Sequence, residues 1–245
     1  VYIRSAPEPV KRAVFIATNT EGVDTGLGTL HNFAMTLALF GYDVDLIPYG
    51  QDFTPADLAD AELVVVLPPH DFPAEDTIVD QYDVTWTSEQ ADVVEDYVND
   101  GGFLLVTNSW RRYDLFNEAH DYNEDWSDLN VLTQRFGVTF SEQRPDANFS
   151  PVAPSTLFDN LETLEFGEDS AVIFTVDSPR GVSLIDDTTG FAILAGLEHG
   201  DNGGLILVLG DFGMLRSSVE MQGDAAANLR CWFNLAQFAT LHAEN

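Results

Sequence analysis

The stretch Asp96-Tyr-Val-Asn-Asp-Gly-Gly-Phe-Leu-Leu-Val-Thr-Asn-Ser-Trp110 decides the fold of this chain. It opens with the end of an amphipathic helix that starts at Thr87-Ser-Glu-Gln and carries apolar residues at helical spacing from 93 to 98. A Gly-Gly turn follows, and residues 103–107 form an apolar run typical of a strand buried on both faces. A helix, a glycine turn and a buried strand in this order indicate an α/β fold.

The same alternation of short apolar runs and helical patterns extends over the rest of the chain. We expect strands at 13–18, 44–47, 63–67, 103–107, 138–140, 171–176, 182–185, 191–197 and 205–209, and helices at 30–40, 54–57, 87–98, 129–136 and 224–242. Turn residues at 198–204 predict a hairpin between the last two strands. The pattern predicts one α/β domain over 1–245, with a mostly parallel sheet, helices on both faces, an antiparallel C-terminal extension and an irregular elaboration at 141–170.

The chain is strongly acidic, with 41 Asp and Glu against 10 Lys and Arg and a formal net charge of −31. Such a surface repels nucleic acid and anionic lipid, so neither is expected as a partner. The acids are spread along the chain, which favours adaptation to high salt; binding of cations or of a cationic partner is the alternative. No apolar run is long enough to insert into a membrane, and the single Cys231 is expected to be a buried structural thiol.

Three local patterns carry a resemblance to a known family. They are Trp86-Thr-Ser-Glu-Gln leading to Tyr97-Val-Asn-Asp-Gly-Gly-Phe, Asp128-Leu-Asn-Val-Leu-Thr-Gln-Arg-Phe-Gly-Val-Thr-Phe140, and Gly203-Gly-Leu-Ile-Leu-Val-Leu-Gly-Asp211. In this order they resemble the class I glutamine amidotransferase-like fold, a three-layer flavodoxin-like architecture. The likeness is to the family's non-enzymatic branches, which are domains of extracellular, envelope-associated and trafficking proteins.

The family's enzymes place a nucleophilic cysteine, flanked by glycines, at a tight elbow after a strand, with a histidine and an acid behind it. The matching region here is Thr107-Asn108-Ser109-Trp110-Arg111, which has no cysteine and has bulky residues in place of the glycines. The resemblance therefore implies a non-catalytic branch that lacks the nucleophile.

Polar residues follow several predicted strands at their carboxyl ends, where ligands bind in open α/β sheets. The candidate ligand-binding residues are Asn19, Glu21, His70, Asn108, Ser109, Arg111, Arg112 and Asp211. The paired arginines could clamp a carboxylate or phosphate, or they could neutralise nearby acids such as Asp114 and Asp121.

Two further hypotheses concern chemistry at the same edge. Ser109 could act as a nucleophile with His70 or His199 as its base. Asp121, Asn123 and Asp125 alternate like calcium ligands, although Trp126 at the sixth position and Leu132 at the twelfth exclude a full EF-hand. A looser calcium site and a solvated acidic loop both stay open, and no other cofactor is expected.

The interpretation favoured by the sequence is a non-catalytic binding or assembly domain of an extracellular or envelope protein. It would recognise a protein or small-molecule partner through loops 68–86 and 108–127. The alternatives are a serine-dependent amide or ester hydrolase using Ser109, and a structural subunit of a cation-bridged polymer or complex. The cytoplasm of a salt-accumulating organism is the alternative location. A homo-oligomer and a place in a larger multidomain chain both stay open.

Overall fold

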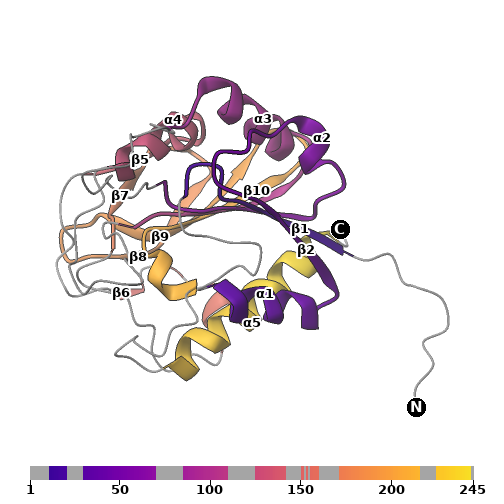
Figure 1. The fold of residues 1–245 in the computed structure, drawn as a ribbon. Helices are drawn as coiled ribbons and strands as arrows, with labels where there is room; N and C mark the ends of the chain where they lie inside the picture. Colours follow the sequence, from indigo (N-terminus) through magenta and orange to yellow (C-terminus); the bar gives the residue numbers. More distant parts are fainter. Residues whose placement is uncertain are drawn as a thin grey trace, which may run out of the picture.

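The computed structural model describes residues 11–20, 30–69, 85–109, 125–141, 150–151, 153, 155–159, 171–215 and 225–243. Within these ranges one ten-stranded sheet lies between two layers of helices (Figure 1). This arrangement confirms the predicted α/β class with helices on both faces. Among the described helices, none is both long enough and apolar enough to span a membrane.

One half of the sheet is parallel. Its five strands lie in the order β2 (Tyr42–Ile47), β1 (Lys11–Ile16), β3 (Leu63–Val66), β4 (Phe103–Thr107) and β10 (Gly204–Leu209). Every neighbouring pair among them is parallel, so their carboxyl ends meet at one edge.

The other half of the sheet is antiparallel. It contains β9 (Ala192–His199), β8 (Gly181–Asp186), β7 (Phe174–Val176), β6 (Ser150–Pro151) and β5 (Val138–Phe140). The hairpin between β9 and β10 is confirmed. The expectation of a mostly parallel sheet holds for only half of it, because β5 and β6, from the middle of the chain, also pair antiparallel. Apolar runs report burial rather than strand direction.

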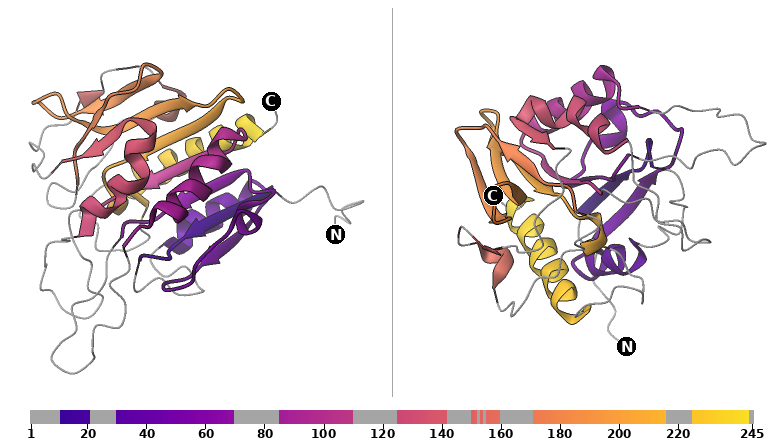
Figure 2. Two further views of the ribbon diagram at one scale, coloured as in Figure 1. Left: turned by 90° about the horizontal axis from the view of Figure 1, so that it is seen from above. Right: turned by 90° about the vertical axis from the view of Figure 1, so that its left-hand side faces the viewer.

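The helices divide between the two faces of the sheet (Figures 1 and 2). Helices α1 (His31–Leu39) and α5 (Ala225–Ala243) cover one face. Helices α2 (Pro55–Leu58), α3 (Ser88–Asn99) and α4 (Asn130–Thr133) cover the other, with 3-10 turns at Asp125–Leu129 and Gln134–Phe136 beside α4.

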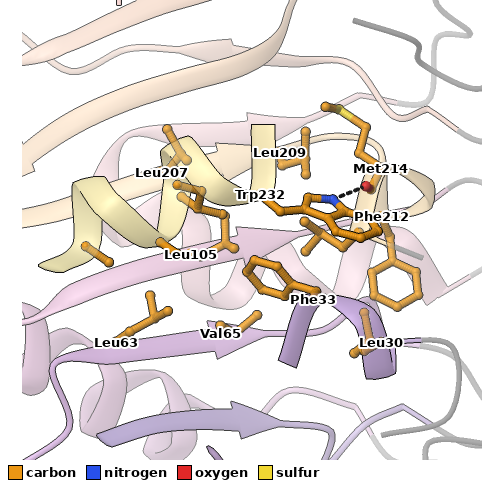
Figure 3. Close-up of a cluster of buried hydrophobic side chains, with 14 of the residues drawn as sticks. Leu30, Phe33, Leu63, Val65, Leu105, Leu207, Leu209, Phe212, Met214 and Trp232 are labelled. Carbon is orange, nitrogen blue, oxygen red and sulfur yellow. Dashed lines mark hydrogen bonds between the residues drawn. The ribbon is translucent and has the colours of Figure 1, made fainter. Parts of the chain in front are cut away.

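Alternate residues of each central strand fill two separate hydrophobic cores. In β3, Leu63 and Val65 face α1 and α5, whereas Val64 and Val66 face α2, α3 and α4. Figure 3 shows the first core, where the indole of Trp232 donates a hydrogen bond of 2.6 Å to the backbone oxygen of Met214. Cys231 packs against this core, and burial raises the pKa of its thiol to about 12, in line with a structural thiol.

The link between α3 and β4 explains why residues 96–110 are so informative about the fold. The hydroxyl of Tyr97 donates to the backbone oxygen of Phe103 and accepts from its N–H, both at 3.1 Å. The ring lies so close to Gly102 that a Cβ there would fall 2.3 Å from Tyr97 Cζ. Gly101 has φ +101°, a conformation that favours glycine. Both glycines are therefore required by the turn.

Candidate functional site

The candidate site is the edge where the parallel strands end. Ile16 of β1 pairs with Val66 of β3, Val66 pairs with Val106 of β4, and Val106 pairs with Val208 of β10. The segments that follow these strands therefore start side by side. Asn19, Asn108, Ser109 and Asp211 lie at this edge, as the sequence predicts, and all four are buried.

Three threonines connect neighbouring segments of the edge. Thr20 Oγ1 donates to the backbone oxygen of Pro68 at 2.8 Å, and Thr107 Oγ1 donates to that of Val66 at 2.9 Å. Thr18 Oγ1 donates to the backbone oxygen of Gln51 at 2.9 Å. These connections cannot be predicted from the sequence, because a threonine at a strand end has the same pattern as any other strand residue.

Asn108 joins three segments of the chain. Its Nδ2 donates to the backbone oxygen of Trp126 at 2.9 Å, and its Oδ1 accepts from the N–H of Ser109 at 2.8 Å. Its backbone oxygen accepts from the N–H of Phe212 at 2.8 Å. Both ends of the predicted ligand-binding amide are thus engaged within the protein, so Asn108 is a structural joint at the tip of β4.

Asp211 starts the turn that leads from β10 toward α5. Its carboxylate accepts from the N–H of Gly213 at 2.8 Å, and its backbone oxygen accepts from the N–H of Met214 at 3.1 Å. Met214 in turn accepts the indole hydrogen bond of Trp232 on α5. Asp211 is fully buried and stabilises this turn from within.

Asn19, after β1, differs from its neighbours at the edge. Its side chain is buried, and among the described residues neither Nδ2 nor Oδ1 has a hydrogen-bond partner. An amide withdrawn from water without partners destabilises the folded state by roughly 1–3 kcal/mol per group. Asn19 therefore has a donor and an acceptor available for a group from outside the described chain.

Several candidate residues lie outside the described residues: Glu21, His70, Arg111, Arg112, Asp121 and Asn123. Asp125 begins a 3-10 turn, but only its backbone is described. Among the described residues, no group of three or more His, Cys, Asp or Glu could hold a metal ion. The arginine clamp and the loose calcium site stay predictions.

His199 lies at the end of the sheet where the parallel strands begin, whereas Ser109 lies at the end where they finish. His199 pairs with Gly204, the first residue of β10. Ser109 comes two residues after Thr107, which pairs with Leu209, the last residue of β10. Five residues of strand separate the two levels, which is about 16 Å at the usual rise per residue. The His199 ring packs edge-on against Phe136, with centroids 4.9 Å apart. The hypothesis that His199 is the base for Ser109 is therefore wrong.

Two hollows lie at the end of the sheet where the parallel strands begin, and no sequence pattern predicts them. One, of about 390 Å³, lies between α2 and α3 and is lined by Leu58, Val93 and Tyr97. The other, of about 520 Å³, is lined by Arg180 and His199, among others. Arg180 donates to the backbone oxygen of Gly200 at 2.9 Å, which fixes the turn between β9 and β10.

No protein-family model matches this chain, and no curated protein matches it. Similar solved structures exist at low sequence identity. The mmIFT52 N-terminal domain is 15% identical with a TM-score of 0.64, over 93% of this chain and 97% of that one. The cytoplasmic protein STM3548 from Salmonella typhimurium is 12% identical with a TM-score of 0.55, over 93% and 98%. The cytoplasmic protein STM1381 from Salmonella typhimurium LT2 is 13% identical with a TM-score of 0.54, over 93% and 99%. At these identities the likeness shows the fold alone, and this chain shares that fold over nearly its whole length.

Proposed function

We propose that this chain is a non-catalytic recognition or assembly domain that binds a protein or small-molecule partner at the carboxyl edge of its sheet. The contact would be made chiefly by residues 68–86 and 108–127. The observation that carries the proposal is that the tip of β4, at Asn108 and Ser109, is buried and hydrogen-bonded within the protein. Ser109 is only 2% exposed, and the neighbouring Asn108 fastens the tip to two other segments.

A serine nucleophile needs an accessible Oγ and a base within hydrogen-bond reach. Burial of Ser109 opposes access by a substrate carbonyl, and His199 lies at the other end of the sheet. Of the predicted bases, only His70 is left, outside the described residues. The hydrolase hypothesis is therefore the alternative that the first experiment must address.

Asn19 supports recognition at this edge. Its buried amide offers one donor group and one acceptor without partners among the described residues. A carbonyl, carboxylate or hydroxyl from a partner could accept from Nδ2, and an N–H or O–H could donate to Oδ1.

Two locations fit the proposal. The resemblance to non-enzymatic amidotransferase-like domains favours an extracellular or envelope protein. Two of the similar structures are named cytoplasmic proteins, which favours the cytoplasm of a salt-accumulating organism. A net charge of −31 suits either location at high salt, because counterions screen the repulsion between acids.

The first test uses a fluorophosphonate serine probe on folded protein in molar KCl, beside a Ser109→Ala variant. We expect no labelling of either protein. Labelling of the wild type that disappears in Ser109→Ala would show an activated serine, and the hydrolase would then replace the proposal.

The second test addresses recognition directly. Residues 110–124 are replaced by a Gly-Ser linker of equal length, and both proteins are used to capture partners from the source organism. Arg180→Gln, at the opposite edge, is the matched control. We expect a defined partner that binds the wild type and the control but not the linker variant. A partner retained equally by all three would refute recognition through this edge.

A further inference from the structure

The acids of this chain are unevenly placed on the folded molecule. Helices α1 and α5 have 9 and 19 residues and contain no Asp or Glu at all, although 41 of the 245 residues are acidic. At the average of the chain, two helices of this combined length would carry about five acids. By contrast, α3 carries four acids within 12 residues: Glu89, Asp92, Glu95 and Asp96. The helical layer over one face is thus acidic, and the layer over the other is not.

The acid-free layer exposes apolar side chains instead. Met35 and Leu39, one helical turn apart on α1, are 50% and 73% exposed, and Leu241 on α5 is 52% exposed. The other exposed residues described on these helices are neutral or basic: His31, Asn32, Ala38, Arg230 and Gln237. We call this surface of α1 and α5 the acid-free face.

Three described acids near this face point away from it or lie at its border. On the edge strand β2, Val44 and Leu46 pack toward α1 and α5, so Asp43 and Asp45 point to the opposite side. There Asp45 pairs with Arg12 at 2.6 Å. Asp159 marks one border, because its backbone oxygen accepts from Nδ2 of Asn234 on α5 at 3.0 Å. Asp224 and Glu244, which flank α5 in sequence, lie outside the described residues.

The two helices of this face are held together by aromatic contacts. Phe33 of α1 meets Trp232 of α5 edge-on with centroids 6.4 Å apart, and Phe40, just after α1, meets Phe233 at 5.8 Å. Figure 1 shows α1 and α5 side by side below the sheet. The face is therefore formed in the single chain and does not need a partner to assemble it.

We infer that the acid-free face is the contact between two copies of this chain. A cationic partner would be drawn to the acidic layer around α3 rather than to this face. Two copies of a molecule with charge −31 repel each other wherever their acids meet. A two-fold contact places the same patch of both copies together, so α1 and α5 can meet their own copies without opposing carboxylates from these two helices, and the contact can bury Met35 and Leu39. This inference does not depend on the proposed function, which uses the carboxyl edge of the sheet.

The test is the association state of the full chain in KCl, measured by sedimentation equilibrium over a range of protein concentrations. We expect a reversible dimer whose dissociation constant falls as KCl rises from about 0.2 M to about 2 M, because salt shortens the reach of the remaining repulsion. A chain that is monomeric at every concentration, or a dimer that weakens as salt rises, would overturn the inference.

Variants locate the contact. Leu39→Asp and Gln237→Asp each add a carboxylate to an exposed position of the acid-free face, on α1 and α5 respectively. Each should raise the dissociation constant at least about tenfold, as expected for a charge placed within a buried contact. Val182→Asp is the matched control, because Val182 is an apolar residue 52% exposed on β8.

All of these positions are exposed, so the variants should fold, and circular dichroism with thermal melting checks this. The inference is supported if both face variants weaken the dimer and Val182→Asp does not. It is overturned if the face variants dimerise like the wild type, or if Val182→Asp weakens the dimer as much as they do.

Discussion

Replacing Tyr97 by Phe tests the physical explanation of the α3–β4 link. The substitution keeps the ring that packs on Gly102 and removes only the hydroxyl. In the wild type that hydroxyl bonds both the N–H and the carbonyl of Phe103, each at 3.1 Å, at the start of β4. Phe103 is fully buried, so water cannot readily replace the lost partner.

The expected loss of stability comes from the N–H and the carbonyl of Phe103, which no longer have the Tyr97 hydroxyl as a partner. A buried backbone N–H without a partner destabilises a protein by roughly 1–3 kcal/mol, while a carbonyl with two lone pairs tolerates the loss better. We therefore expect Tyr97→Phe to lower the free energy of unfolding by about 2 kcal/mol. For a domain of this size that corresponds to a fall in Tm of roughly 4–8 °C.

The same residue makes a prediction about pH. Burial raises the pKa of the Tyr97 hydroxyl well above its ordinary value of 10. Above pH 10 the unfolded chain loses this proton while the folded protein keeps it, so rising pH favours unfolding. The contribution of the neutral hydroxyl is complete below pH 10 and is lost as pH rises further. The stability difference between wild type and Tyr97→Phe should therefore shrink above pH 10, by about 1.4 kcal/mol per pH unit.

Urea unfolding in 2 M KCl, followed by circular dichroism between pH 7 and pH 11, measures both effects. A double-mutant cycle with Gly102→Ala and Tyr97→Ala adds a geometric check. Because a Cβ at Gly102 collides with the Tyr97 ring, Gly102→Ala should destabilise the Tyr97→Ala protein less than the wild type. A Tyr97→Phe protein as stable as the wild type at neutral pH, or additive effects in the cycle, would refute the explanation.

Three further substitutions test other joints of the fold by the same urea unfolding. Thr87→Ala should lower the free energy of unfolding by about 1 kcal/mol, because Thr87 Oγ1 accepts from the Gln90 N–H at 3.1 Å at the start of α3. Thr87→Ser should keep this cap, and an equal loss of stability in both variants would contradict the prediction. Gly204→Ala should lower the free energy of unfolding by about 3 kcal/mol or more, because a Cβ there would lie 1.9 Å from the backbone oxygen of Val98. Gly190→Ala is the control: its Cβ would meet nothing within 4 Å, so only the smaller strain of its positive φ should destabilise the fold. Asn108→Ala should destabilise by about 2–4 kcal/mol and change tryptophan fluorescence, because it removes the hydrogen bonds of the Asn108 side chain to the Trp126 carbonyl and the Ser109 N–H. Unchanged stability would show that Asn108 does not hold the tip of β4 in place.

Much of the fold could be predicted from the sequence because its signals are local. Phe103–Thr107 and Val138–Phe140 are strands with the predicted bounds, and the predicted helix start at Thr87 has its capping bonds. Gly137 ends its turn with φ +77°, as a glycine after a helical segment indicates. Each of these features depends on a few neighbouring residues, so the local sequence is enough to predict it.

Strand direction and the detail of the site depend on contacts between distant segments. The bond from Asn108 to the backbone of Trp126 and the lack of any described partner for Asn19 cannot be read from residue type, because both are asparagines at strand ends. The separation of His199 from Ser109 follows only from the register of β10 between β9 and β4. The sequence could therefore indicate the edge but not which of its side chains are occupied.

In a chain where about one residue in six is acidic, the positions that lack acids are the more informative ones. Acids on the α3 layer keep that surface hydrated and identify no partner by themselves. Exposed Met35 and Leu39 have no such explanation, because they remove hydrated carboxylates from a surface that otherwise carries them. If the acids of this chain serve solubility, we expect acids at these positions too, unless something else covers them. A surface composition that departs from the rest of the molecule therefore indicates a contact more specifically than hydrophobicity alone, and the association measurements on Leu39→Asp and Val182→Asp compare these two criteria directly.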